Sequence, residues 1–275
     1  MGLILHCGGE QVTRADIESV PVPTPTRSWK PVSYGDALAF IENEANDRGM
    51  TVVRENYGLN KKGNQMFGVL TLDTGRADQG MALGYRASYN KSLAPTLVGG
   101  ASVFVCDNLC ISGSSFKVVR RNTVNVWRDL TEKIVAHLDE VTEHYEQVTK
   151  ETDAMREVGV ETDLGYAALG TMFGHGILTP NQASVAFQDW REPRHEEFED
   201  RNLWSLYNCV TEGLKKGPAG GIFSRHAKAH GFFVENLVPV LMADGELEYM
   251  SAPEASSHGI DDGQIGRAIL RDMLN

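Results

Sequence analysis

The sequence has few of the residues that build metal knuckles or disulfide frameworks. Its four cysteines stand at positions 7, 106, 110 and 209, and their spacing matches neither a zinc site nor a disulfide-stabilised scaffold. We therefore expect reduced thiols in or near a core. No apolar run reaches membrane-spanning length, and the opening residues lack the pattern of a secretory signal. Both absences predict a cytoplasmic protein without membrane contact.

Enzyme motifs are missing as well. The glycines after Lys215-Lys216 lack the GxxxxGK[ST] order of a P-loop, and there is no GxSxG nucleophile elbow. His226 and His230 stand one helical turn apart, but the glutamate of an HExxH zinc motif is absent. The sequence thus predicts no metal site and no cofactor, and it favours binding over catalysis.

Charge is divided unevenly along the chain, whose formal net charge is -11. Residues 1–123 carry 13 Lys and Arg against 11 Asp and Glu, whereas residues 124–275 carry 13 against 26. An acidic protein is a poor generic binder of nucleic acid, because phosphate affinity depends on Lys and Arg. The excess of acidic over basic residues lies entirely in the C-terminal half. The argument against nucleic-acid binding therefore does not apply to the N-terminal half.

Hydrophobic periodicity predicts an α+β fold. Prolines 21, 23, 25 and 31 favour an extended N-terminal arm over residues 1–33. A helix over 34–48 follows, and then strand patterns over 51–56, 65–72, 80–88, 97–106 and 116–119 that turn signals divide into hairpins. We expect one antiparallel, hairpin-built sheet.

One long helix over 123–157 is predicted to pack on that sheet, because apolar residues recur along it at spacings of three and four. Its other faces are acidic, which is typical of a solvated surface but also suits a docking surface. Shorter helical patterns follow over 164–173, 182–189, 202–215 and 221–229. The expected organisation is an arm (1–33), an α+β core (34–158) and a helical C-terminal region (159–275) packed on the core.

The segment from Gly80 to Gly113 is the most informative part of the chain, because two strand patterns flank a basic and aromatic stretch. Basic residues gather in and just after it, with Asp107 the only acid between Gly84 and Arg121. Cations beside aromatic rings are typical of proteins that bind single-stranded nucleic acid. The candidate interface residues are Tyr85, Arg86, Tyr89, Lys91, Lys117, Arg120 and Arg121. An ordinary hairpin with solvated cations explains the same pattern.

A second basic island lies in the C-terminal half, where it suits a supplementary phosphate or partner contact. Its residues are Lys215, Lys216, Arg225 and Lys228. Asp107-Asn108, at the end of the predicted strand, are interpreted as a structural turn, because such residues usually satisfy local backbone groups. A metal-dependent nuclease or nucleotide-modifying reaction at Asp107 is a weaker alternative, because no partner residues for it are found.

Several stretches in the same order resemble the phage- and plasmid-like family that carries the domain of unknown function numbered 932. They cover nearly the whole chain: Val12–Arg14, Pro21–Thr26, Tyr57–Leu59, Gln65–Leu70, Gly84–Ser92, Val103–Leu109 and Asn202–Glu212. The family's usual form of the Gly84–Ser92 segment has a His-Asp pair where Tyr89-Asn90 stand here, which further disfavours catalysis. The resemblance implies a mobile-element protein in a bacterial host cell, without a settled function.

The order of hairpins followed by a long helix is similar to single-strand annealing proteins of the RecT and Red-beta type. By that analogy we expect a protein that binds single-stranded DNA, assembles into a homo-oligomeric ring or filament, and anneals strands in recombination. The alternative is a non-catalytic interaction protein, for example an inhibitor of a host factor that mimics DNA with its acidic half. The sequence leaves both open.

Overall fold

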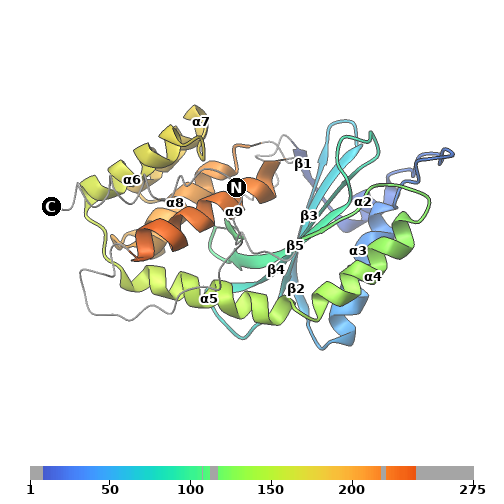
Figure 1. Cartoon of the computed structure of the whole chain (residues 1–275), viewed down its shortest axis with the longest axis horizontal. Helices are drawn as coiled ribbons and strands as arrows, with labels where there is room; N and C mark the ends of the chain where they lie inside the picture. Colours follow the sequence, from blue (N-terminus) through green and yellow to red (C-terminus); the bar gives the residue numbers. More distant parts are fainter. Residues whose placement is uncertain (1–8, 107, 112–116, 218–220, 240–275) are drawn as a thin grey trace. The chain divides into compact units, whose positions relative to one another are not determined.

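The computed structural model describes residues 9–106, 108–111, 117–217 and 221–239 (Figure 1). These residues form an α+β fold in two compact units. The first unit contains the described residues up to Thr149 together with Leu214–Ala227, and the second contains Lys150–Gly213 together with those from Lys228 onward. The division at Thr149 lies before the expected one at residue 158, and the segment 214–227 belongs to the first unit.

An antiparallel sheet is the centre of the first unit. Its strands follow chain order: β1 (Gly9–Val12), β2 (Val52–Asn60), β3 (Gln65–Leu72), β4 (Gln79–Ser88) and β5 (Thr96–Val103). Beyond β5 lie β6 (Asn108–Cys110) and β7 (Lys117–Val119), which both pair with β5. The registers Val103↔Asn108 and Thr96↔Val119 place them one after the other along the same edge of β5.

Turn chemistry explains why the hairpin β2–β3 closes where it does. The Asn60 side-chain oxygen accepts hydrogen bonds from the backbone N–H groups of Asn64 and Gln65. Gly63 adopts a φ of 64°, in the left-handed region that favours glycine. The predicted strand over 65–72 is confirmed at both ends, because this turn fixes its start and Asp73-Thr74-Gly75 its end.

Helical segments from distant parts of the chain contribute buried residues to the first unit. Helix α3 (Tyr34–Asp47) begins at the N-cap Ser33 and buries Tyr34, Leu38 and Ile41. On β3, β4 and β5, Phe67, Ala82 and Val98 form a core cluster with Ile222 and Phe223 from the start of α9 (Ile222–Phe232). The central strands are therefore covered by segments that lie far apart in the sequence.

The extended arm predicted over residues 1–33 is wrong in part, because helix α2 (Arg14–Ser19) lies within it. Thr13 and Asp16 form a reciprocal capping box, which satisfies backbone N–H groups at the helix start. The prolines that disfavour a helix begin only at Pro21, after α2 has ended. From there to Ser33 the chain has no helix or strand.

The single long helix predicted over 123–157 is also wrong, because α4 (Val126–Leu138) and α5 (Val141–Glu157) are separate helices. Arg48, just after α3, bonds to the carbonyl oxygen of Val135 at 3.2 Å and to the carboxylate of Asp139 at 2.8 Å. These contacts satisfy groups at the end of α4 and favour the break there.

The second unit is helical. It contains α6 (Thr162–Gly174), α7 (Pro180–Arg191), the short η1 (Glu196–Phe198), nearly all of α8 (Leu203–Leu214) and the π-helical turn η3 (Phe233–Leu237). Gly165 of α6 lies against the ring of Trp190 in α7, where a Cβ atom would come within 2.4 Å of the indole. None of the helices in the described ranges combines the length and apolar character that crossing a bilayer requires.

Candidate nucleic-acid interface

Four segments that are distant in sequence meet at one end of the sheet. The N–H of Tyr89 donates to the carbonyl of Asn64 at 2.8 Å, which joins the β2–β3 turn to the β4–β5 turn. The backbone N–H of Arg120 donates to the carbonyl of Pro95 at 3.1 Å, and the backbone N–H of Lys30 donates to the carbonyl of Asn122 at 3.0 Å. We name residues 26–34, 60–65, 88–96 and 119–125 together the cationic end. Figure 1 shows the two hairpin turns side by side there.

The cationic end has an unusual charge for so acidic a chain, because its four segments contain no Asp or Glu. Its seven cations are Arg27, Lys30, Lys61, Lys62, Lys91, Arg120 and Arg121. All are exposed except Lys30 and Arg120, which are half-buried. Arg120 is paired with Asp129 of α4, but the four segments themselves carry no acid. Such a concentration of cations attracts polyanions, and it does so more strongly at low salt.

Lys91 and Trp29 form the first half of an aromatic platform at this end. The Lys91 ammonium nitrogen lies 5.0 Å from the centre of the Trp29 ring, within cation–π range. Lys91 has a φ of 66° and is the sole non-glycine residue with positive φ in the described ranges. Such backbone conformations cost energy and occur often at functional sites, so this turn is a candidate site on geometric grounds.

Tyr89 forms the second half of the platform. Its ring stacks on that of Tyr34 with centroids 3.9 Å apart and planes within 2°. The Tyr89 hydroxyl accepts a hydrogen bond from the backbone N–H of Tyr34 at 3.1 Å, and burial raises the pKa of Tyr89. Tyr34 thus covers one face of the half-buried Tyr89 ring. The stacking and the hydrogen bond together hold the Tyr89 ring in one orientation.

Arg120 and Arg121 differ in availability although they are adjacent. Arg120 bonds to the carboxylate of Asp129 in α4, which holds the pKa of that carboxyl below its usual range. Its side chain is still 38% exposed. Arg121 is exposed and follows β7 directly, so it contributes the freer positive charge of the two.

The structure places Tyr85 and Arg86 away from the cationic surface. Tyr85 is 1% exposed, so its ring cannot stack on a base, and the interpretation of Tyr85 as a stacking residue is wrong. Arg86 is half-buried with its guanidinium 5.1 Å from the centre of the Phe223 ring, and burial lowers its pKa. Phe223 of α9 therefore covers the face of the sheet that Arg86 shares with Gly84.

Three further predicted residues bear on the strand ends. Lys117 lies in β7 at the outer edge of the sheet, and its side chain is not among the described parts of the structure. Asp107 lies outside the described residues altogether. Asn108 starts β6 and is 1% exposed, paired in register with Val103. Its burial fits a structural role at the strand end.

The second basic island is not one surface. Lys215 is 1% exposed, and its ammonium donates to the Cys106 carbonyl oxygen at 2.6 Å, so it supports the end of β5 from within. Lys216 and Lys228 are exposed, and Arg225 is half-buried. Because Lys228 belongs to the second unit and the others to the first, these cations are not assigned to a common site.

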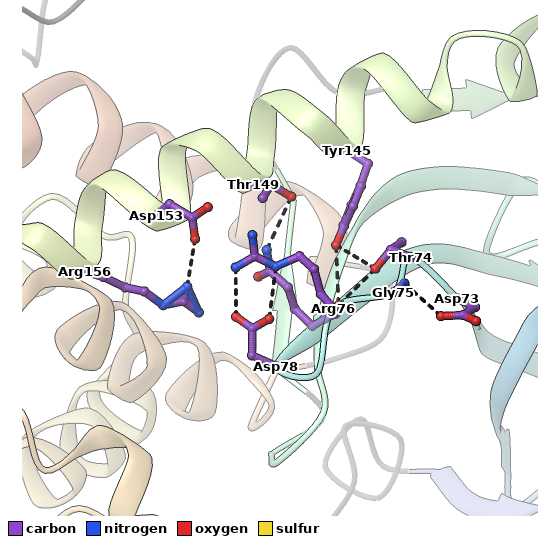
Figure 2. A network of polar contacts seen from close by, with 10 residues as sticks. Asp73, Thr74, Gly75, Arg76, Asp78, Tyr145, Thr149, Asp153 and Arg156 are labelled. Carbon is purple, nitrogen blue, oxygen red and sulfur yellow. Dashed lines mark hydrogen bonds and ion pairs between the residues drawn. The ribbon is translucent and has the colours of Figure 1, made fainter.

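The opposite end of the sheet differs in charge and is attached to α5. Figure 2 shows Tyr145 of α5 reaching the β3–β4 turn, where its hydroxyl lies 3.1 Å from the Thr74 hydroxyl and 3.4 Å from the Gln79 carbonyl oxygen. In the same turn, Arg76 pairs with Asp78 at 3.0 Å. Since Asp73 adds another carboxylate, this turn has no surplus of cations.

Sequence reasoning missed five members of the cationic end. Lys61 and Lys62 lie in a sequence typical of a turn, and Arg27, Trp29 and Lys30 lie in the predicted arm, so no local pattern indicates an interface role for them. Their shared signal is the absence of acidic residues from each short segment. The convergence of those segments comes from the pairings β2–β3, β3–β4 and β5–β7, which no local pattern specifies.

Comparison with known proteins gives little context. The UPF0380 protein YfjQ of Escherichia coli (strain K12) is 28% identical over 130 residues, which cover 46% of this chain and 45% of that protein. The chain therefore spans less than half the length of this curated relative, whose name states no activity. No model of a known protein family matches the chain, and no solved structure matches it significantly.

Proposed function

We propose that the cationic end binds single-stranded DNA, with its lysines and arginines on the phosphates and the rings of Trp29 and Tyr89 against bases. The observation that carries this proposal is the convergence of seven cations and the rings of Trp29 and Tyr89 from four segments that contain no Asp or Glu. Neutralised phosphates supply most of the affinity, and base stacking adds about 1–3 kcal/mol for each ring.

Single strands suit this surface better than duplexes do. Stacking on an aromatic side chain requires an unpaired base with a free face. The cationic end is built from turns and an irregular segment rather than from a helix that would enter a major groove. Binding without base-specific hydrogen bonds would serve a step that acts on many sequences, such as strand annealing in the recombination of a phage or other mobile element.

Fluorescence anisotropy with a labelled single-stranded oligonucleotide tests the proposal on the full chain. We expect saturable binding at low salt that unlabelled single strands displace more effectively than duplex of equal length. The double variant Lys61→Ala with Lys62→Ala should weaken it by at least tenfold. The matched control, Lys133→Ala with Lys150→Ala, removes two exposed lysines from α4 and α5 and should leave affinity unchanged. No binding by the wild-type chain at low salt contradicts the proposal.

A second candidate function is supported by the acidic faces of α4 and α5. Five exposed carboxylates follow one another along these helices in the first unit: Glu132, Asp139, Glu140, Glu143 and Glu146. Such a surface suits a protein partner, including a nucleic-acid-binding host factor for which it would act as a DNA mimic. Stoichiometric capture of one host protein that survives nuclease treatment, together with no binding of single-stranded DNA, would favour this alternative.

A further inference from the structure

In the described ranges, three strands of the first unit's sheet have no further strand beside them, namely β1 at one side and β6 and β7 at the other. The residues of β6 are all buried. At one side β1 pairs with residues 57–60 of β2, while residues 52–56 of β2 have no strand partner on that side in the described ranges. At the other side β7 pairs only with β5. Unpaired strand edges expose N–H and C=O groups and are templates for pairing with another chain.

Each edge also exposes an apolar side chain. Val53, in the uncovered part of β2, is 52% exposed, and Val119, the last residue of β7, is 45% exposed. An exposed valine on an edge strand adds apolar surface that a pairing strand would bury. We name β1 with residues 52–56 the first edge, and β7 with Arg120 and Arg121 the second edge.

The two edges carry opposite charge. Around the first edge, Arg14 and Arg54 stand against four carboxylates, those of Glu10, Asp16, Glu18 and Glu55. Glu10, Asp16 and Glu18 are exposed, and Arg14 is already paired with Glu18 at 2.8 Å. The second edge contains no acid of its own; its Arg120 is paired with Asp129 of α4, and its Arg121 is exposed. Two first edges, or two second edges, would therefore repel each other, whereas a first edge attracts a second edge.

Strand direction agrees with this pairing. The steps from β1 through β2, β3, β4 and β5 to β7 are all antiparallel, so β1 and β7 run in opposite directions. When a second copy with the same orientation lies beside the first, β7 of one copy and β1 of the next form a further antiparallel pair. Antiparallel addition of a strand to an exposed edge is a recurrent mode of association.

We propose that the chain associates head to tail with further copies of itself, the first edge of one copy pairing with the second edge of the next. A head-to-tail contact generates a closed ring or an open filament rather than a two-fold dimer. Because every copy keeps the same orientation, the cationic ends of successive copies lie along one side of the assembly. The cations outside the second edge, Arg27, Lys30, Lys61, Lys62 and Lys91, then form a continuous track for a single strand, and that consequence rests on the proposed function.

Sedimentation velocity on the full chain without nucleic acid tests the assembly. One variant blocks the first edge with Glu10→Lys and Val53→Lys, and another blocks the second edge with Val119→Asp and Arg121→Asp. We expect the wild-type chain to form species larger than dimers, and each variant to sediment as a folded monomer of about 30.2 kDa. Circular dichroism confirms folding, and Phe173→Asp, at an exposed site in the second unit, should not alter assembly.

Mixing the two blocked variants is the sharpest part of the test. Each retains one intact edge, and those edges are complementary, so the mixture should yield a heterodimer of twice the monomer mass and nothing larger. A wild-type monomer at every concentration would overturn the proposal, and so would either variant forming dimers with itself. Anisotropy on the wild-type chain and on the first-edge variant separates the two proposals, because Val119 and Arg121 of the second-edge variant belong to the cationic end. A monomer that still binds DNA removes the assembly and leaves the binding function standing.

Discussion

The Lys91 ammonium lies over the ring of Trp29, so that the turn between β4 and β5 is joined to the segment that precedes α3. In the proposed complex a base stacks on the face of the indole opposite this cation, and the ammonium meets a phosphate of that nucleotide. The pair is thus the smallest element of the cationic end that combines both kinds of contact.

Trp29→Ala should weaken binding of single-stranded DNA by about 1–3 kcal/mol, or roughly 5- to 150-fold, because it removes one stacking face. Trp127→Ala is the matched control. Trp127 is 41% exposed and makes an edge contact with Phe40, outside the four segments of the cationic end. Anisotropy titrations at one salt concentration compare the two variants. Equal losses of affinity in the two variants would show that Trp29 does not stack on a base.

Lys91→Asn should reduce affinity for single-stranded DNA without a loss of stability. Asparagine tolerates the left-handed backbone conformation that Lys91 adopts, so the turn is retained while the charge is removed. We expect an unchanged melting temperature and several-fold weaker binding. Lys91→Val is the complementary variant, because a β-branched residue is strained at positive φ, and it should lower the melting temperature. A Lys91→Asn chain that binds as well as wild type would remove Lys91 from the interface.

Gly165→Ala should destabilise the second unit, because the new methyl group would overlap the buried ring of Trp190. Overpacking of this kind typically costs about 1–3 kcal/mol. Gly170→Ala, in the same helix α6, meets nothing within 4 Å and should stabilise by up to about 1 kcal/mol. Urea unfolding of the two full-length variants measures both effects. Two changes of the same sign would contradict the packing of α6 on α7.

Tyr85→Phe should make the protein less sensitive to alkali. Burial raises the pKa of Tyr85 above its ordinary value of 10.0, so the folded chain keeps a proton that the unfolded chain loses. Its contribution to stability is therefore complete below pH 10 and falls by about 1.4 kcal/mol for each unit above it. The variant should lack this part of the decline.

Near neutral pH the same substitution should be neutral or stabilising, because the Tyr85 hydroxyl has no hydrogen-bond partner among the described residues. Urea unfolding at about pH 7 and above pH 10 measures both effects. Tyr166→Phe, at a half-buried site in the second unit, is the control. A Tyr85→Phe chain with the alkaline decline of wild type would show that this phenol does not titrate with unfolding.

Most helices and strands could be predicted from the sequence, but the exposure of individual site residues could not. The α+β class, the limits of β3 and the helices of the second unit follow from periodicity, capping residues and turn signals. The burial of Tyr85 does not, because it depends on contacts from outside β4. The phenol of Tyr85 interacts with those of Tyr34, at the start of α3, and of Tyr89. The start of α9 covers the opposite face of β4, at Gly84 and Arg86.

The same limit applies to the cationic end. Local patterns identified Lys91, Arg120 and Arg121 as candidates, but the turn containing Lys61 and Lys62 joins them only through strand pairing. The helix break after Leu138 depends on Arg48, a tertiary contact from α3 that has no counterpart in the apolar spacing of α4 and α5. Long-range contacts decided the burial of Tyr85, the composition of the cationic end and the break after Leu138, whereas helix α2 in the predicted arm begins at a local capping box.

The salt dependence of binding to single-stranded DNA tests the central claim most directly. Anisotropy titrations over a series of salt concentrations give the slope of log affinity against log salt, which falls by about 0.7 for each phosphate contact with a single strand. The account predicts a steep negative slope for the wild-type chain, shallower by about 1.4 in the Lys61→Ala, Lys62→Ala variant. A wild-type affinity that does not change with salt, or a variant with the wild-type slope, would contradict it.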